Sequence, residues 1–144
     1  AVFKSDEYTI YTRLIEGKYF AYQKMFTEGE INTCASRTAL IGAMTRAKMC
    51  TEEKQPAVFQ IEDDVLNISI RDKLADYQEQ VPLQETVCKS IRLGFDSRLV
   101  LETLKAFTCD NIALGFTSPR TPMIVEAEDS DMKAMVLPVA IREV

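Results

Sequence analysis

The stretch FDSRLVLETLKAF at residues 95–107 and the apolar run MVLPV at residues 135–139 decide the fold. Asp96 precedes the periodic part of the first stretch, and its carboxylate can accept hydrogen bonds from the free amides of a first helical turn. Apolar residues follow at helical spacing, and polar residues share the opposite face. The apolar side consists of Leu99, Val100, Leu101, Leu104 and Phe107, and the polar side of Arg98, Glu102 and Lys105. The pattern predicts a capped amphipathic helix.

A second helix is predicted upstream, from Asn32 or Thr33 to about Met49. Its apolar residues at helical intervals are Ala39, Leu40, Ala43, Met44 and Ala47. Arg37, Arg46 and Lys48 lie outside this apolar arc, so we expect all three cations to face solvent. No acidic residue occurs between Glu30 and Glu52, so this interval carries a charge of +3 in a chain whose net charge is -5. One surface is therefore distinct from the acidic remainder.

Strands are predicted before, between and after the two helices. A hairpin of residues 2–4 and 8–14 opens the chain. The other predicted strands are 57–61, 65–70, 76–81, 86–95, 111–117, 122–127 and 133–141, with acidic turns at 62–64 and 128–131. A helix followed by consecutive strands thus occurs twice. Two amphipathic helices side by side can cover one layer of antiparallel sheet, so the predicted fold class is α+β.

The composition favours one ordinary globular domain, because 144 residues with 47% hydrophobic content can form a core. Apolar runs are far shorter than the roughly 20 residues that span a bilayer, and the first residues lack the pattern of an export signal. We therefore expect a cytoplasmic protein with no membrane partner. Four cysteines are widely spaced, and they are predicted to be small buried hydrophobes in a reducing compartment. They are Cys34, Cys50, Cys88 and Cys109.

Catalysis has little support in the sequence. Histidine, the commonest general base and metal ligand, does not occur, and the carboxylates cluster in predicted turns, where solvation explains them. Phosphate-binding glycine motifs and nucleophile elbows are also missing. We expect no catalytic residue, no metal and no cofactor.

Residues 94–107, with the strand after them and the closing VLPV run, resemble the last domain of the bacterial DNA polymerase sliding clamp, the beta subunit of the replicative polymerase. The upstream sequence RLIEGKYFAY at residues 13–22 is similar to the family's run (L/I)-(D/E)-G-x-(F/Y)-P-D-Y, with Phe20 and Ala21 in place of the usual Pro and Asp. The resemblance covers nearly the whole chain. It implies that residues 1–27 are the closing strands of the preceding clamp domain with the inter-domain linker, and that residues 28–144 are the C-terminal clamp domain.

In this family such domains close into a ring whose helices line a channel. The resemblance therefore implies a processivity factor that encircles double-stranded DNA, tethers the replicative polymerase and is a homodimer at full length. The expected channel face consists of Arg37, Arg46, Lys48, Arg98 and Lys105. These cations would meet the phosphate backbone through diffuse, salt-sensitive electrostatics that carry no sequence information. The alternative is an ordinary solvated helix face.

The run 135–139 is too continuous for a strand with one face in water, so both faces should be covered or one should bind a partner. The resemblance implies a hydrophobic cleft that receives linear peptide motifs of polymerases and the clamp loader. Its linker side would be Tyr22, Lys24, Met25 and Phe26, and its strand side Met135, Val136, Leu137, Pro138 and Val139, flanked by Pro122 and Met123. The alternative is that these residues pack in the core.

Two further functional classes stay open from the sequence. The chain could be a stand-alone α+β module that binds a peptide or small ligand in the apolar cleft and has no role with DNA. An enzyme is the third class, and it would need a pocket with perturbed carboxylates.

Overall fold

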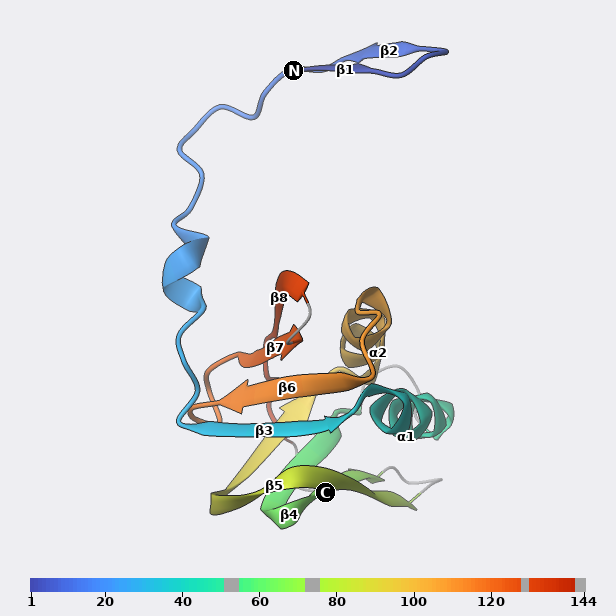
Figure 1. The fold of residues 1–144 in the computed structure, drawn as a ribbon, viewed down its shortest axis with the longest axis vertical. Helices are drawn as coiled ribbons and strands as arrows, with labels where there is room; N and C mark the ends of the chain where they lie inside the picture. Colours follow the sequence, from blue (N-terminus) through green and yellow to red (C-terminus); the bar gives the residue numbers. More distant parts are fainter. Residues whose placement is uncertain (51–54, 72–75, 128–129, 142–144) are drawn as a thin grey trace.

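The computed structural model describes residues 1–50, 55–71, 76–127 and 130–141. It has a packed body and an extended N-terminal arm (Figure 1). The arm contains β1 (Val2–Lys4), β2 (Thr9–Tyr11) and the short 3-10 helix η1 (Tyr22–Met25). The body contains β3 (Ile31–Ser36), α1 (Arg37–Met49), β4 (Ala57–Arg71), β5 (Asp76–Phe95), α2 (Ser97–Ala106), β6 (Asn111–Phe116), β7 (Met123–Ala127) and β8 (Ser130–Val136).

The strands of the body form one sheet of six strands in the order β4-β5-β3-β6-β7-β8. Each neighbouring pair is antiparallel. The two helices lie beside each other and contact one another (Figure 1). Helix α1 packs against β3, β4 and β5, while α2 contacts β8. The predicted α+β class, with two helices packed on antiparallel sheet, is confirmed.

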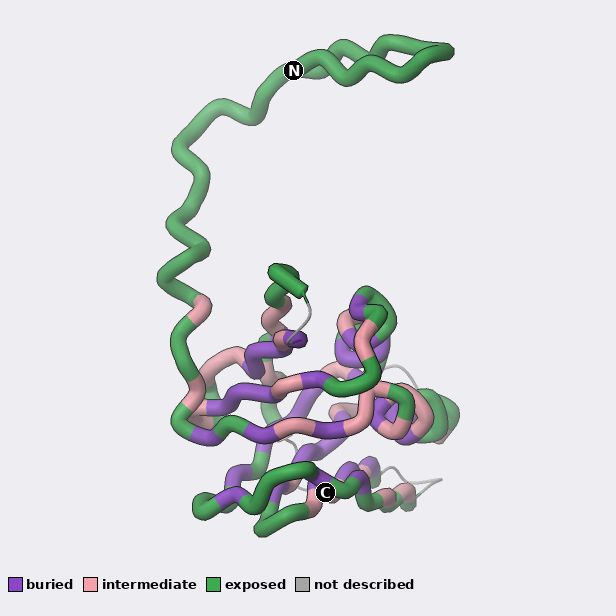
Figure 2. Tube along the Cα trace, in the orientation of Figure 1, coloured by how far each residue is buried: buried purple, intermediate pink, exposed green. Residues whose placement is uncertain are grey.

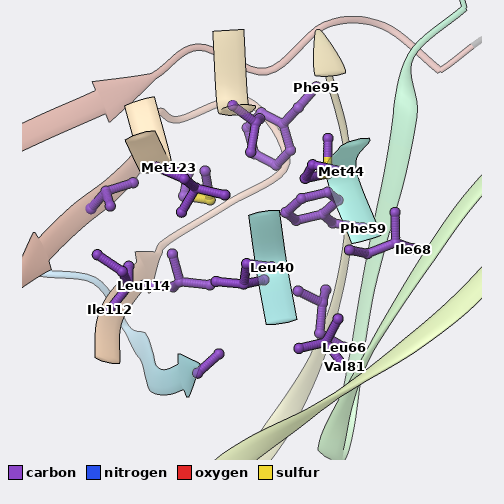
Figure 3. Packing of buried hydrophobic residues seen from close by; sticks show 14 of the residues in the cluster. Leu40, Met44, Phe59, Leu66, Ile68, Val81, Phe95, Ile112, Leu114 and Met123 are labelled. Atoms are coloured by element: carbon purple, nitrogen blue, oxygen red, sulfur yellow. The ribbon is translucent and has the colours of Figure 1, made fainter. Parts of the chain in front are cut away.

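The core lies between the helices and the sheet (Figure 3). Leu40 and Met44 of α1 point into it and are almost fully buried. Phe59 of β4 and Phe95 of β5 meet edge to face, with ring centroids 5.2 Å apart and planes at 68°. This geometry is favourable for aromatic pairs, so the two rings add a contact between the long strands β4 and β5.

The predicted start of the first helix is wrong, because residues 31–36 form strand β3. Ile31, Thr33 and Ala35 alternate inward along this strand, which pairs with β6 over its whole length. Helix α1 begins at Arg37, and the Ser36 hydroxyl caps it by accepting a hydrogen bond of 3.4 Å from the Ala39 amide. The pairing partner lies about 80 residues downstream, so a local pattern could not reveal it.

The predicted turn at 62–64 is also wrong. β4 continues through these residues as one strand, with irregular register between Ile61 and Val65 and a positive φ of 51° at Asp63. Aspartate tolerates this left-handed conformation, which suits a bulge as well as a turn. The predicted strands 76–81 and 86–95 likewise form the single strand β5.

Helix α2 confirms the predicted cap. The Asp96 carboxylate accepts hydrogen bonds from the amides of Arg98 (2.8 Å) and Leu99 (3.3 Å). Val100, Leu101 and Leu104 are buried as expected. The prediction that Leu99 belongs to the buried apolar side is wrong, because Leu99 lies on the first turn with 46% of its surface exposed.

The C-terminal strand is shorter at its end than predicted. β8 runs from Ser130 to Val136, not from residue 133 to residue 141. Beyond it, the Val139 amide donates to the Gly94 carbonyl at 2.8 Å, in an isolated bridge to the end of β5. Pro138 has no amide hydrogen to continue a ladder, which is consistent with the break. Part of the predicted acidic turn, residues 128–129, and the last residues, 142–144, lie outside the described residues.

The cysteine prediction is wrong for Cys88, which is exposed on β5. Cys34, Cys50 and Cys109 are half-buried, and none of the four cysteines is in a disulfide. Of these, Cys109 packs against the core.

The N-terminal hairpin is confirmed, with Val2 opposite Tyr11 and Lys4 opposite Thr9, although its second strand spans Thr9–Tyr11 and not residues 8–14. Every residue from 1 to 25 is exposed (Figure 2). The arm nevertheless carries many large apolar side chains, among them Phe3, Ile10 and Ile15. A two-stranded hairpin is at best marginally stable in water, so this arm has the composition of a segment that packs against another surface.

Candidate functional site

The first predicted channel cation, Arg37, forms hydrogen bonds that connect the two helices. Its Nε donates to the Cys109 carbonyl at 2.6 Å in a partly buried hydrogen bond, and its amide donates to the Asp110 carbonyl at 2.9 Å. Both acceptors lie in the segment after α2. Arg37 therefore links the N-terminus of α1 to the C-terminal end of α2, and the expectation that it simply faces solvent is corrected.

Arg46 forms a three-residue network with β5. Its Nε donates to Glu79 Oε2 at 2.8 Å and its Nη2 to Glu79 Oε1 at 2.5 Å, which is the bidentate arrangement of a guanidinium on a carboxylate. The Tyr77 hydroxyl lies within hydrogen-bonding distance of the same carboxylate and 2.9 Å from the Ala43 carbonyl. The Arg46–Glu79–Tyr77 network thus fastens α1 to β5.

The network shifts the pKa of each member. The Arg46 hydrogen bonds lower the pKa of Glu79 to about 2, with a further contribution from Tyr77. Burial, followed by the hydrogen bond to Glu79, raises the pKa of Tyr77 above its ordinary value. The hydrogen bond to Glu79 also raises the pKa of Arg46. The guanidinium stays charged, but a carboxylate neutralises that charge locally.

The three other predicted channel cations are exposed. Lys48 lies near the end of α1 and Lys105 in the last turn of α2. Arg98 is 3.8 Å from the Asp96 carboxylate, with 62% of its side chain exposed. Glu102 is exposed on the same helix. Both helices therefore present exposed cations, and those on α2 lie on the polar face that the sequence predicted.

The residues of the predicted peptide cleft are divided between the core and the surface. Val136 and its cross-strand partner Met123 are 3% and 1% exposed, so both belong to the core and neither can line an open cleft. Leu137 and Val139 are exposed, at 59% and 41%, in the segment after β8. Met135, Pro138 and Pro122 are half-buried. We call the apolar segment 137–139 the C-terminal tail.

The linker side of the predicted cleft is open to solvent. Tyr22, Lys24 and Met25 are exposed in η1, while Phe26 is half-buried. The Tyr22 ring also meets Tyr19 and Phe20 at centroid distances of 5.9 Å and 6.4 Å. This aromatic cluster includes two residues that the sequence did not indicate as site residues.

A pocket of about 340 Å³ lies between residues 26–29 and the strands β6, β7 and β8. Of the predicted cleft residues, Phe26 alone lines it. The other lining residues are Thr27, Glu28, Gly29, Asn32, Ala113, Leu114, Gly115, Ile124, Glu126 and Lys133. Sequence reasoning missed these residues, since no local motif joins Gly29 to Gly115, a strand glycine 86 positions later. We call this site the linker pocket.

Within the described parts of the chain, no group of three or more cysteine, aspartate or glutamate side chains could hold a metal ion. The same residues contain no helix that is long and apolar enough to cross a membrane.

Comparison with known proteins agrees with this architecture. Residues 25–140 match the family model of the DNA polymerase III beta subunit, C-terminal domain. The beta sliding clamp of Halalkalibacterium halodurans is 24% identical over 135 residues, which are 90% of this chain and 36% of that protein. The chain therefore spans little more than a third of the length of this relative.

Solved structures show the same fold. The DNA polymerase III beta chain of Streptococcus pneumoniae superposes with a TM-score of 0.85 at 21% identity, over 96% of this chain and 38% of that one. The DNA polymerase III subunit beta of Pseudomonas aeruginosa gives a TM-score of 0.87 at 20% identity, over 97% and 39%. Since the family model spans most of the packed body and both helices, the chain belongs to the family of the DNA polymerase III beta subunit and contains its C-terminal domain.

Proposed function

We propose that this chain is part of a DNA sliding clamp, a processivity factor that tethers a replicative polymerase to duplex DNA. The observation that carries the proposal is the match of residues 25–140 to the C-terminal domain of the beta subunit family. The adjacent helices α1 and α2 support it, since they contact each other and both carry exposed cations. Such a protein holds DNA by ring closure and performs no chemistry, so its role is non-catalytic and cytoplasmic.

In this proposal the channel surface acts through weak, sequence-independent attraction to phosphates. Lys48, Arg98 and Lys105 supply the exposed charge, while Arg37 and Arg46 mainly hold α1 in place through their partners in the domain. Weak contact suits a ring that must slide. The full-length protein would be a homodimer whose ring is closed by two copies.

The proposed domain division places residues 1–27 with the preceding clamp domain and the linker, and residues 28–144 in the C-terminal domain. The exposure of residues 1–25 supports this division, because the apolar side chains of the arm lack a covering surface within the described residues. A preceding domain would cover them at a free-energy gain of about 25 cal/mol per Å² of apolar surface.

The proposed peptide site is the C-terminal tail together with Met25 and Tyr22. Leu137 and Val139 carry the proposal, since they are large, apolar and exposed next to Pro138, which fixes the local backbone. Apolar anchors of polymerase and clamp-loader motifs would dock on this surface. Methionine is adaptable, which suits a site that accepts several related peptides.

A titration followed by fluorescence polarisation tests the peptide site. The probe is a fluorescein-labelled clamp-binding peptide from a bacterial replicative polymerase. The Leu137→Asp substitution places a charge on the tail and should weaken binding at least tenfold. Met49→Asp is the matched control, because Met49 is also apolar and 82% exposed but lies at the end of α1.

Saturable binding that survives Met49→Asp and is lost in Leu137→Asp supports the proposed site. Equal binding by all three folded proteins contradicts the tail as the site. Failure of every protein to bind, with the fold intact by circular dichroism, contradicts peptide binding by this chain.

A further inference from the structure

The linker pocket lies on the same sheet face as Met135. Ile124 pairs with Met135, and Glu126 pairs with Lys133, so these four side chains project from one face of the β7–β8 pair. Ile124, Glu126 and Lys133 line the pocket. The pocket therefore lies beside β8, the strand that leads into the C-terminal tail, although the tail residues do not line the pocket.

Two glycines shape the pocket. A Cβ atom on Gly115 would lie 3.1 Å from Asn32 Oδ1 and 3.6 Å from the Ile124 Cβ, so it would project among the lining residues. A Cβ on Gly29 would lie only 2.7 Å from the Phe116 amide nitrogen, so no other residue fits there without a backbone shift. Gly29 therefore allows the chain before β3 to approach β6 closely, while the absence of a side chain at Gly115 leaves space among the lining residues.

The interior of the pocket suits an apolar group. Phe26 covers it from the linker side, and Ala113 and Ile124 contribute side chains from the sheet, whereas the Leu114 side chain projects to the opposite face, into the core. A volume of about 340 Å³ is at the lower end of the range for ligand sites and accommodates one or two side chains. An extended peptide running beside β8 could place one large apolar side chain here.

The rim of the pocket is acidic. Glu28 comes from the segment before β3 and Glu126 from β7, and Lys133 is the only cation among the lining residues. The Lys133 ammonium donates to Glu126 Oε1 at 2.7 Å, which leaves Glu126 Oε2 and the Glu28 carboxylate without a partner among the described residues. Two carboxylates against one ammonium favour a cationic group on the occupant.

We propose that the linker pocket is a second peptide-binding subsite, which takes a large apolar side chain next to a lysine or arginine that is bound between Glu28 and Glu126. This inference rests on the proposed function, since it adds a subsite to a peptide surface that the C-terminal tail begins.

Glycine amide signals in nuclear magnetic resonance spectra give a direct readout. The chain has five glycines, so a ¹⁵N-labelled sample gives few signals in the glycine region. Gly29 and Gly115 line the pocket, Gly94 contacts Val139 of the tail, and Gly17 and Gly42 lie in the linker and in α1. The probes are N-acetyl-Phe-Arg-amide and its acidic counterpart N-acetyl-Phe-Glu-amide.

The proposal predicts saturable shifts of Gly29 and Gly115 with the Phe-Arg probe, at a Kd on the order of 1 mM for so small a ligand. The Phe-Glu probe should bind at least fivefold more weakly. The Glu28→Gln variant should weaken the Phe-Arg probe at least threefold and leave the Phe-Glu probe unchanged or stronger. Gly115→Ala should weaken both, with Gly29 as the reporter.

Four results overturn the proposal. If the Gly29 and Gly115 signals do not shift when the probe is added, the probe does not bind in the pocket. If only the Gly94 signal shifts, the probe binds at the tail. Equal affinity of the two probes, or no change in Glu28→Gln, removes the role of the carboxylates. The proposed function is tested separately by the polymerase peptide and Leu137→Asp. If the polymerase peptide binds while the Gly29 and Gly115 signals do not shift with the dipeptide probes, this inference alone is overturned.

Discussion

At the scale of single residues, Arg46 shows how a helical pattern can place a residue correctly and still mistake its role. Its position outside the apolar arc of α1 is right, and the residue is exposed. Its bidentate partner, Glu79, lies 33 positions away on β5. No spacing rule within α1 contains that information, because the sheet alone brings the two together. The same holds for Arg37 and the Cys109 carbonyl.

The Arg46–Glu79–Tyr77 network predicts an acid-sensitive contribution to stability. The folded-state pKa of Glu79 is lowered from 4.5 to about 2, so the stabilisation is present above pH 4.5 and is lost as the pH falls through about 2. Because the pair is partly exposed to solvent, we expect the contribution to be about 1 kcal/mol. Urea unfolding at pH 7, 4 and 3 measures it.

The matched variant for this prediction is Glu79→Gln, which keeps the shape and removes the titrating group. Its free energy of unfolding should be lower than that of the wild type at pH 7, and the difference should shrink as the pH falls below 4.5. Parallel pH profiles for the two proteins would show that Glu79 adds nothing to the acid response.

Thr33 gives a second prediction at this scale. It is 3% exposed on β3, and its hydroxyl has no hydrogen-bond partner among the described residues. A buried unpaired hydroxyl is unfavourable, and valine has nearly the same shape with high strand propensity. Thr33→Val should raise the free energy of unfolding by about 1 kcal/mol in urea titration.

Thr38→Val is the control, because Thr38 is exposed and its hydroxyl bonds to Ser36. That variant should not be stabilised. A loss of stability in Thr33→Val would mean that the hydroxyl is satisfied in solution.

At the scale of elements, α2 could be predicted because its signals are local. Asp96 precedes the helix, and the buried positions follow at helical spacing. The start of α1 could not, since Asn32 and Thr33 are plausible caps and only the pairing with β6 makes them strand residues. The acidic stretch at 62–64 has turn chemistry, but its pairing with β5 makes it a bulge inside a longer strand.

The candidate site was partly predictable for the same reason. Pro138 and the exposed apolar residues beside it form a contiguous run that composition can detect. Met123 and Val136 are core residues because of the register of β7 and β8. The sequence does not reveal this register, because every residue of the run 135–139 is apolar and no alternation marks the buried face. The linker pocket depends on Gly29 and Gly115, which meet only in the folded chain.

The cap of α2 is testable on its own. Asp96→Ala removes the acceptor of two amide hydrogen bonds in the first turn, so it should lower the free energy of unfolding by about 1 kcal/mol. Differential scanning calorimetry and urea titration both measure the change. Asp131→Ala is the control on exposed strand β8, and it should change stability much less. If Asp96→Ala and Asp131→Ala lowered the free energy of unfolding equally, Asp96 would not stabilise the protein as a helix cap.

At the scale of the whole molecule, the chain combines a packed body with an arm that is exposed throughout (Figure 2). The body buries residues from both helices and from β3 to β8 in one core. The arm carries apolar and aromatic side chains that a water-exposed segment does not need. This asymmetry is what the proposed assembly explains, since a ring built from several such domains needs linkers and strands that pack between bodies.

Retention on circular DNA tests the central claim, that this domain completes a ring around the duplex. Residues 25–144 would replace the last domain of the Halalkalibacterium halodurans clamp. The hybrid, once shown by light scattering to form a ring-sized dimer, would be loaded onto nicked circular DNA by that organism's clamp loader.

The account predicts that the loaded hybrid stays on circular DNA through gel filtration in high salt, as the parent clamp does, and leaves when a restriction enzyme linearises the circle. An assembled hybrid that is never retained on circles, or that stays equally well on linear DNA, would contradict the claim.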